Sequence, residues 1–248
     1  MKTLKQHINE ALKIGKNLSE WSSYSCQPKT RIELKEIIED RISKEGQKCD
    51  LNDIDTSLID NMSYLFAYSR FNGDISKWDV SNVIDMFGMF SYSKFNGDIS
   101  MWNVSNVEDM RCMFKESHFN GDISKWNVKN AKNMDEMFYK SKFNGDISKW
   151  NTSNIENMYR MFFDTVFNKD ISKWNVNKVK NMSYMFTKSH FNEDISKWNV
   201  KNVNDMTNMF YGSKFNQNIS NWNIRKDCSV IGMLDKCPIE DEYKPKIK

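Results

Sequence analysis

The sequence predicts an α/β repeat solenoid: a right-handed array of about eight 24-residue units, each made of a strand and a short helix, preceded by N-terminal helices. Two aromatic series carry this prediction. Phenylalanine and tryptophan each recur every 24 residues without insertion or deletion, and a fixed period of this length is the signature of a stacked array. The series are Phe71, Phe95, Phe119, Phe143, Phe167, Phe191 and Phe215, and Trp78, Trp102, Trp126, Trp150, Trp174, Trp198 and Trp222.

One unit, residues 71–94, predicts both elements. Trp78 and Val80 alternate with polar neighbours, which predicts a short strand with one buried face. After a possible N-cap at Ser81, four apolar residues fall on one face of a helix: Val83, Met86, Met89 and Phe90. A strand and a helix within 24 residues have the geometry of a leucine-rich repeat.

A single unit cannot fold alone. Eight buried apolar side chains at about 1.5–3 kcal/mol each contribute roughly 12–24 kcal/mol. Ordering the backbone of 24 residues costs about 1–2 kcal/mol per residue. The units must therefore stack.

The array is expected to span residues 47–238, with imperfect first and last copies. The preceding segment, residues 30–46, is predicted as a capping helix. Thr30 can cap the amide of Glu33, Glu33 can reach back, and the helix stops before Gly46. A helix at this place is expected to cover the core of the first unit.

The remaining segments are predicted as accessories to the array. Residues 1–20 form an amphipathic helix, residues 21–29 a linker, and residues 239–248 a polar tail. The N-terminal helix either packs on the array or docks a partner. Its apolar face consists of Leu4, Ile8, Ala11, Leu12 and Leu18.

The pattern FNxDISxWxVSNVxxMxxMF resembles the BspA-like leucine-rich repeats of bacterial and protozoan surface proteins and Mycoplasma lipoproteins. The entry segment CDLNDIDTSLIDNMSYLF and the exit segment GMLDKCPIEDEYKP resemble the ends of that family. The resemblance implies a leucine-rich-repeat-like fold and a binding or adhesion role, often at a cell surface, without catalysis.

Composition limits the classes of partner and the cellular locations that we expect for this protein. The mean hydropathy is −0.71 and no apolar run approaches 18 residues, so no membrane span is expected. The first residues lack the apolar segment of a signal peptide, which predicts a cytoplasmic protein. Residues 47–238 hold 24 basic and 23 acidic residues, a balance that argues against nucleic acid as a partner.

One candidate binding face consists of lysines and asparagines that recur with the strands. It could hold a glycan, an acidic protein or an anionic polymer, but asparagine ladders and neighbouring aspartates also have a structural interpretation. For the Asn and Asp residues the structural interpretation is favoured. For the lysines, neither the binding nor the structural interpretation is preferred. The face comprises Lys77, Asp79, Asn103, Lys125, Asn127, Lys149, Asn151, Lys173, Asn175, Lys197 and Asn199.

The alternative face lies on the outer side of the predicted helices, at positions that vary between units. Drift on a solvated surface is the simpler interpretation of this variation. Its aromatic content favours recognition instead. The aromatic residues are Phe87, Tyr92, Tyr139, Tyr159, Phe163 and Tyr211.

No catalytic residue, metal site or cofactor site is predicted. The repeated serines, such as Ser76, lack a neighbouring base, since His118 and His190 lie three units apart. The five cysteines form neither a CxxC pair nor a periodic series. The sequence therefore predicts a non-catalytic module for protein–protein recognition, and the alternative is a cell-surface adhesin or structural coat component with glycan as a candidate ligand.

Overall fold

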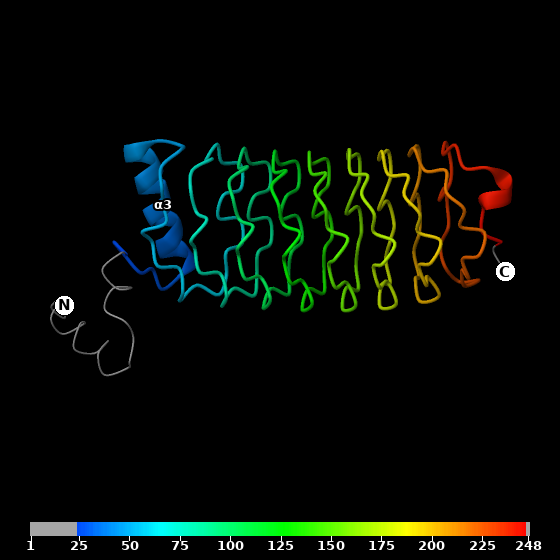
Figure 1. Ribbon diagram of the computed structural model, residues 1–248, viewed down its shortest axis with the longest axis horizontal. Coiled ribbons are helices and arrows are strands. Elements are labelled where there is room, and N and C mark those ends of the chain that lie inside the picture. The colour runs from blue at the N-terminus through cyan, green and yellow to red at the C-terminus, as the bar shows by residue number, and fades with distance from the viewer. Residues whose placement is uncertain (1–23, 247–248) are drawn as a thin grey trace.

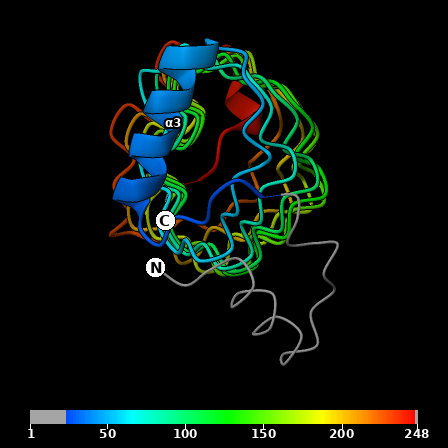
Figure 2. The same ribbon diagram turned by 90° about the vertical axis from the view of Figure 1, so that its left-hand side faces the viewer.

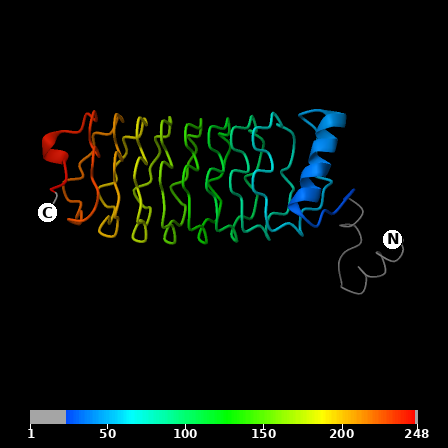
Figure 3. The ribbon, with the colours of Figure 1, turned by 180° about the vertical axis from the view of Figure 1, so that it is seen from behind.

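The computed structural model describes residues 24–246, which form one elongated stack of coils (Figure 1). Isolated parallel bridges join residues that are 24 apart, for example Asp85 and Asp109. Each coil therefore contains one copy of the repeat, which confirms the 24-residue period. The helix α3 (Arg31–Glu45) lies at one end, and the 3-10 helix η1 (Asp241–Tyr243) lies at the other (Figures 1 and 3).

The predicted α/β class is wrong. Within residues 24–246, helix is confined to α3 and η1, and the β structure consists of isolated bridges without a strand. Each coil is instead a succession of turns closed by hydrogen bonds between residues three apart. Three of these bonds run from Trp78 N to Ile75 O (3.2 Å), from Val83 N to Val80 O (3.0 Å), and from Met89 N to Met86 O (3.2 Å).

The helix predicted after Ser81 is replaced by two consecutive turns. Gly88 and Tyr92 have φ angles of 60° and 56°, in the left-handed region, where an α-helix cannot continue. The equivalent residues of the other coils are also left-handed, so the feature belongs to every repeat. They are Tyr64, Tyr68, Cys112, Glu116, Glu136, Lys140, Arg160, Asp164, Tyr184, Lys188, Asn208, Gly212, Gly232 and Lys236.

A left-handed conformation costs a non-glycine residue about 1–2 kcal/mol. Hydrogen bonds between coils offset this cost, because the turns direct alternate N–H groups along the axis of the stack. Gly88 N donates to Arg111 O (2.8 Å), and Tyr92 N donates to Lys115 O (2.7 Å). The regular chain direction is thus set by the neighbouring coil and not by hydrogen bonds within a helix.

The apolar residues of the repeat form the core, as predicted. Their aromatic rings stack from coil to coil: the planes of Trp78 and Trp102 are 2° from parallel, and the centroids of Phe90 and Phe95 are 4.4 Å apart. Turns with three-residue spacing place these side chains inside just as a helix would. In one coil the buried set is Phe71, Ile75, Trp78, Val80, Val83, Met86, Met89 and Phe90.

Asparagine side chains also connect the coils. The Oδ1 atom of Asn72 accepts from the backbone N of Asn96 (2.7 Å), and this contact recurs along the stack. At a second position, Asn106 Nδ2 donates to Ser81 O in the preceding coil (2.7 Å). These asparagines satisfy backbone groups that the turns leave unpaired.

Helix α3 crosses the N-terminal end of the stack (Figure 2). Its N-cap is Thr30, whose side chain accepts from Glu33 N (3.2 Å). Glu33 reaches back to Lys29 N (2.7 Å). Leu34 and Ile38 are buried against the first coil, so α3 covers the apolar end that the sequence predicted it would cover.

The part of the predicted linker that the structure describes pairs with the first coil. Ser25 N donates to Asp53 O (2.7 Å), and Asp55 N donates to Cys26 O (2.9 Å). At the opposite end, Ile219 N donates to Tyr243 O (3.0 Å). The predicted helix over residues 1–20 lies outside the described residues.

Candidate recognition surfaces

The variable face consists of the residues equivalent to Phe87, Gly88, Ser91 and Tyr92 in each coil. These residues belong to the two consecutive turns described above, and their side chains surround the left-handed positions. The backbone follows the same turns in each coil, whereas the side chains differ. The face therefore combines a regular backbone with side chains that vary from coil to coil.

Tyrosine is concentrated on the variable face. The chain has nine tyrosines, and seven of them occupy this face: Tyr64, Tyr68, Tyr92, Tyr139, Tyr159, Tyr184 and Tyr211. Several rings contact a neighbour in the next coil, such as Tyr68 with Tyr92 (4.7 Å between centroids) and Tyr139 with Phe163 (4.9 Å). Such contacts hold the rings in place and reduce the entropy lost when a partner binds.

The predicted aromatic residues of this face are less exposed than the sequence indicated. Tyr92 is exposed, with 37% of its surface accessible. The other five, Phe87, Tyr139, Tyr159, Phe163 and Tyr211, are half-buried by their neighbours in the stack. Each therefore presents one edge or one ring face to solvent.

A charged cluster occupies the middle of the variable face. Glu136 accepts from Lys115 (2.5 Å) and from Arg160 (3.5 Å). The guanidinium of Arg160 also lies over the rings of Tyr159 (4.8 Å) and Tyr184 (5.0 Å). Cations above aromatic rings gain about 0.5–1 kcal/mol at exposed sites, so this arrangement fixes the arginine in one position.

Two further groups beside this cluster have shifted pKa values. Burial, together with the nearby Glu136 carboxylate, raises the pKa of Cys112 to about 11, so the thiol stays protonated at neutral pH. Burial also raises the pKa of Asp135 to about 6. Asn157 donates to one oxygen of Asp135 (2.9 Å), and the other oxygen is buried without a partner.

The candidate binding residues predicted from the sequence did not include Arg111, Lys115, Glu136, Arg160 or Tyr184. Their positions vary between repeats, and this variation could have identified them. Several of their contacts join residues 21–25 apart in the chain, such as Lys115 with Glu136 and Tyr159 with Tyr184. Only the stacking of coils brings such pairs together.

The lysine and asparagine face has a different construction. The Asp and Asn residues of this face accept the backbone N–H two residues later in their own coil, as Asp79 does from Ser81 (2.9 Å) and Asn151 from Ser153 (3.2 Å). These bonds close turns within a coil. The same role is filled by Asn103, Asn127, Asn175 and Asn199.

The five predicted lysines of that face are exposed. Lys77, Lys125, Lys149, Lys173 and Lys197 form no ion pair within the described residues. A hollow of about 480 Å³, with a mixed polar and apolar surface, lies between two of them, lined by Ser124, Lys125, Trp126, Asn127, Lys149 and Asn151.

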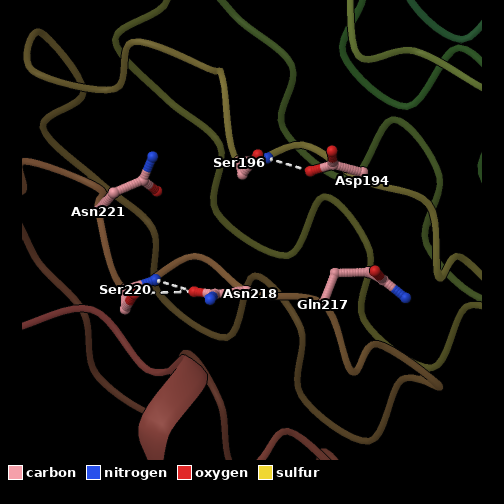
Figure 4. A pocket seen from close by; sticks show the side chains of 6 residues that line it. All are labelled: Asp194, Ser196, Gln217, Asn218, Ser220 and Asn221. Carbon is pink, nitrogen blue, oxygen red and sulfur yellow. Dashed lines mark hydrogen bonds between the residues drawn. The ribbon is translucent and has the colours of Figure 1, made fainter.

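A second hollow, of about 430 Å³ and mainly polar, lies towards the C-terminal end (Figure 4). The repeat changes there, because Gln217, Asn218 and Asn221 take the places of Gly73, Asp74 and Lys77 in the first full unit. Ser220 donates to Asn218 from its backbone N (3.0 Å) and its hydroxyl (2.7 Å). The wall formed by this last coil is therefore uncharged.

Residues 24–246 contain no group of three or more His, Cys, Asp and Glu side chains that could hold a metal ion. In the same range, no helix is long and apolar enough to cross a membrane.

Fold and surface together define a repeat protein of stacked 24-residue coils with a periodic aromatic core. A family model described as "Mycoplasma protein of unknown function, DUF285" matches residues 33–144 and again residues 140–243. The chain belongs to this family. The match gives no specific support for the BspA-like assignment. Neither a curated protein nor a solved structure matches the chain.

Proposed function

We propose that this protein is a non-catalytic module that recognises another protein through the variable face. The observation that carries the proposal is the presence of seven of the nine tyrosines on this face, together with Arg111 and Arg160. Tyrosine and arginine are enriched among the residues that dominate binding energy at protein interfaces. A random surface of this size would not collect most of the tyrosines of the chain.

The geometry of the cluster supports the same proposal. Arg160 is held by Glu136 and by the rings of Tyr159 and Tyr184, so its position is set before a partner arrives. A side chain that is ordered in advance loses less entropy on binding. The mixed charge of the face favours a protein surface of mixed charge over a uniformly charged polymer.

Affinity capture with the full chain tests the proposal. The test variant carries Tyr139→Ser, Tyr159→Ser and Phe163→Ser, and the matched control carries Lys94→Gln, Lys142→Gln and Lys214→Gln, three exposed residues outside the face. We expect proteins captured by both the wild type and the control to be lost with the test variant. Circular dichroism and thermal unfolding of each variant establish that the fold is retained.

Two results would contradict the proposal. One is capture of the same proteins, in the same amounts, by the test variant and the wild type. The other is equal loss of capture by the test variant and the lysine control, which would indicate general adhesion without a specific face. Photo-cross-linking from position 160 identifies the residues of a captured partner that contact the face.

A second candidate function is that of a cell-surface adhesin or a structural coat component. The resemblance of the FNxDISxW pattern to the BspA-like repeats of surface proteins favours it. Our first candidate places the module in the cytoplasm. Protease treatment of intact cells separates the two: degradation of the chain before lysis supports the surface location, and complete protection supports the cytoplasm.

A further inference from the structure

Positive charge is concentrated on one part of an otherwise neutral stack. Residues 124–130, 148–154, 172–178 and 196–202 contain seven lysines and no Asp or Glu. All seven lysines are exposed, and none forms an ion pair within residues 24–246. This lysine strip consists of Lys125, Lys129, Lys149, Lys173, Lys178, Lys197 and Lys201.

The strip follows the axis of the stack. Its four segments belong to four consecutive coils, and hydrogen-bonded coils of this kind lie about 4.8 Å apart. Lys125 and Lys149, from adjacent coils, border one hollow together with Asn127 and Asn151. Ammonium and amide groups therefore face the same space and repeat at the spacing of the coils.

We infer that the lysine strip binds a linear acidic polysaccharide that lies along the axis of the stack. A polymer with one anionic group per sugar offers regularly spaced charges to regularly spaced ammonium groups. The asparagines are expected to bind the hydroxyl groups of the sugars. Because Asn151 Oδ1 already accepts from Ser153 N, its Nδ2 group is left to donate to a sugar hydroxyl.

The surface chemistry favours a polysaccharide over single-stranded nucleic acid. Proteins that bind single strands without sequence preference stack the bases on exposed aromatic rings. The tryptophans of the strip are unsuited to this role, since Trp126 and Trp150 are each only 3% exposed. The exposed groups of the strip are lysine ammonium and asparagine amide groups. The ammonium groups can bind carboxylates or sulfates, and the amides can bind hydroxyl groups.

A row of aspartates limits the affinity. Asp122, Asp146, Asp170 and Asp194 each lie three residues before a lysine of the strip. Hydrogen bonds from the serine two residues later lower the pKa of each carboxyl, and the nearby lysine lowers it further, so all four stay ionised at neutral pH. Their negative charge opposes an anionic ligand.

The last coil shows how to remove that charge without disturbing the turn. Asn218 occupies the aspartate position there, and its Oδ1 atom accepts from Ser220 N (3.0 Å) just as Asp194 Oδ1 accepts from Ser196 N (2.8 Å) (Figure 4). An Asp→Asn change is therefore expected to keep the coil intact. This change is expected to strengthen the binding of an acidic ligand, whereas removal of a lysine is expected to weaken it.

Binding of the full chain to heparin and to polygalacturonate, measured by calorimetry at low salt, tests the inference. We expect Lys125→Gln, Lys149→Gln and Lys173→Gln together to weaken binding about tenfold or more, because charge contacts dominate such complexes. The charge-matched control with Lys142→Gln, Lys188→Gln and Lys214→Gln is expected to retain wild-type affinity. Combined Asp122→Asn, Asp146→Asn and Asp170→Asn is expected to strengthen binding several-fold.

The two polymers distinguish sulfate from carboxylate recognition, and tighter binding of either one supports the inference. Uncharged dextran is expected not to bind. The inference is overturned if neither acidic polymer binds, if the control lysines matter as much as those of the strip, or if oligo(dT) binds more tightly than both polysaccharides. Failure of this test leaves the variable face untouched, since the two surfaces share no residue.

Discussion

The indole Nε1 atom of Trp150 donates a 3.0 Å hydrogen bond to the carbonyl oxygen of Ile123, which belongs to the preceding coil. The same bond occurs at Trp78, Trp102, Trp126, Trp174, Trp198 and Trp222. Each tryptophan thus fills the core of its own coil and fixes the position of the coil before it. This double role explains why tryptophan recurs in every full repeat.

We expect Trp150→Phe to destabilise the protein by about 0.5–1.5 kcal/mol, because the carbonyl of Ile123 would lose one of its two donors and keep only Trp126 N (3.1 Å). Urea unfolding followed by circular dichroism measures the change. The neighbouring exposed substitution Lys149→Gln is the control and is expected to stay within about 0.5 kcal/mol of the wild type. Equal stability of the two variants would show that neither this hydrogen bond nor the larger ring contributes measurably to stability.

The left-handed turns predict a difference between two substitutions at Gly212, whose φ is 63°. A Cβ atom there has space, since its nearest neighbour is Lys188 Cγ at 3.8 Å, so conformation alone sets the cost. Gly212→Ala should destabilise the protein by about 1 kcal/mol, and Gly212→Asn by less, because asparagine tolerates this region better. Thermal unfolding compares them. A greater loss with asparagine than with alanine would argue against this explanation.

Helix α3 is expected to be essential for the solubility of the stack. Leu34 and Ile38 are at most 2% exposed, and Leu34→Ala should destabilise the protein by about 2–5 kcal/mol. Static light scattering during heating should also detect earlier association, because the apolar end of the first coil becomes accessible. Ile32→Ala, on the exposed side of α3, is the control. Unchanged stability of the Leu34 variant would mean that α3 is dispensable.

Asp135 predicts a pH dependence of stability. Burial raises the pKa of Asp135 to about 6 in the folded protein, above its usual value in an unfolded chain. The folded state therefore holds a proton that the unfolded state releases, so the stabilisation is present at low pH and is lost as pH rises through about 6. Because the Asp135 side chain is partly exposed, the resulting change in the free energy of unfolding is limited to on the order of 1–2 kcal/mol.

The variant Asp135→Asn isolates this effect, because asparagine is shaped like the protonated acid and does not titrate. Between about pH 4 and about pH 7, the wild type should lose stability relative to the variant. Urea unfolding at several pH values measures the difference. A constant difference across this range would mean that Asp135 titrates normally.

The sequence by itself determined the period, the stacking, the buried set and the helix that covers the first coil. These follow from spacing: Trp78 and Phe90 must recur on one side of the chain for copies to stack, and Thr30 and Glu33 mark the start of α3 locally. Spacing specifies which side chains point inward. It does not specify the backbone angles that carry them there.

Only the tertiary structure decided that the coils contain turns where a strand and a helix were expected. Val83, Met86 and Met89 are compatible with a helix and with a chain of turns, and the choice depends on hydrogen bonds to the next coil, such as Gly88 N to Arg111 O. Those bonds exist only after stacking. For the same reason, the contacts of Glu136 with Lys115 and Arg160 could not be found from local sequence.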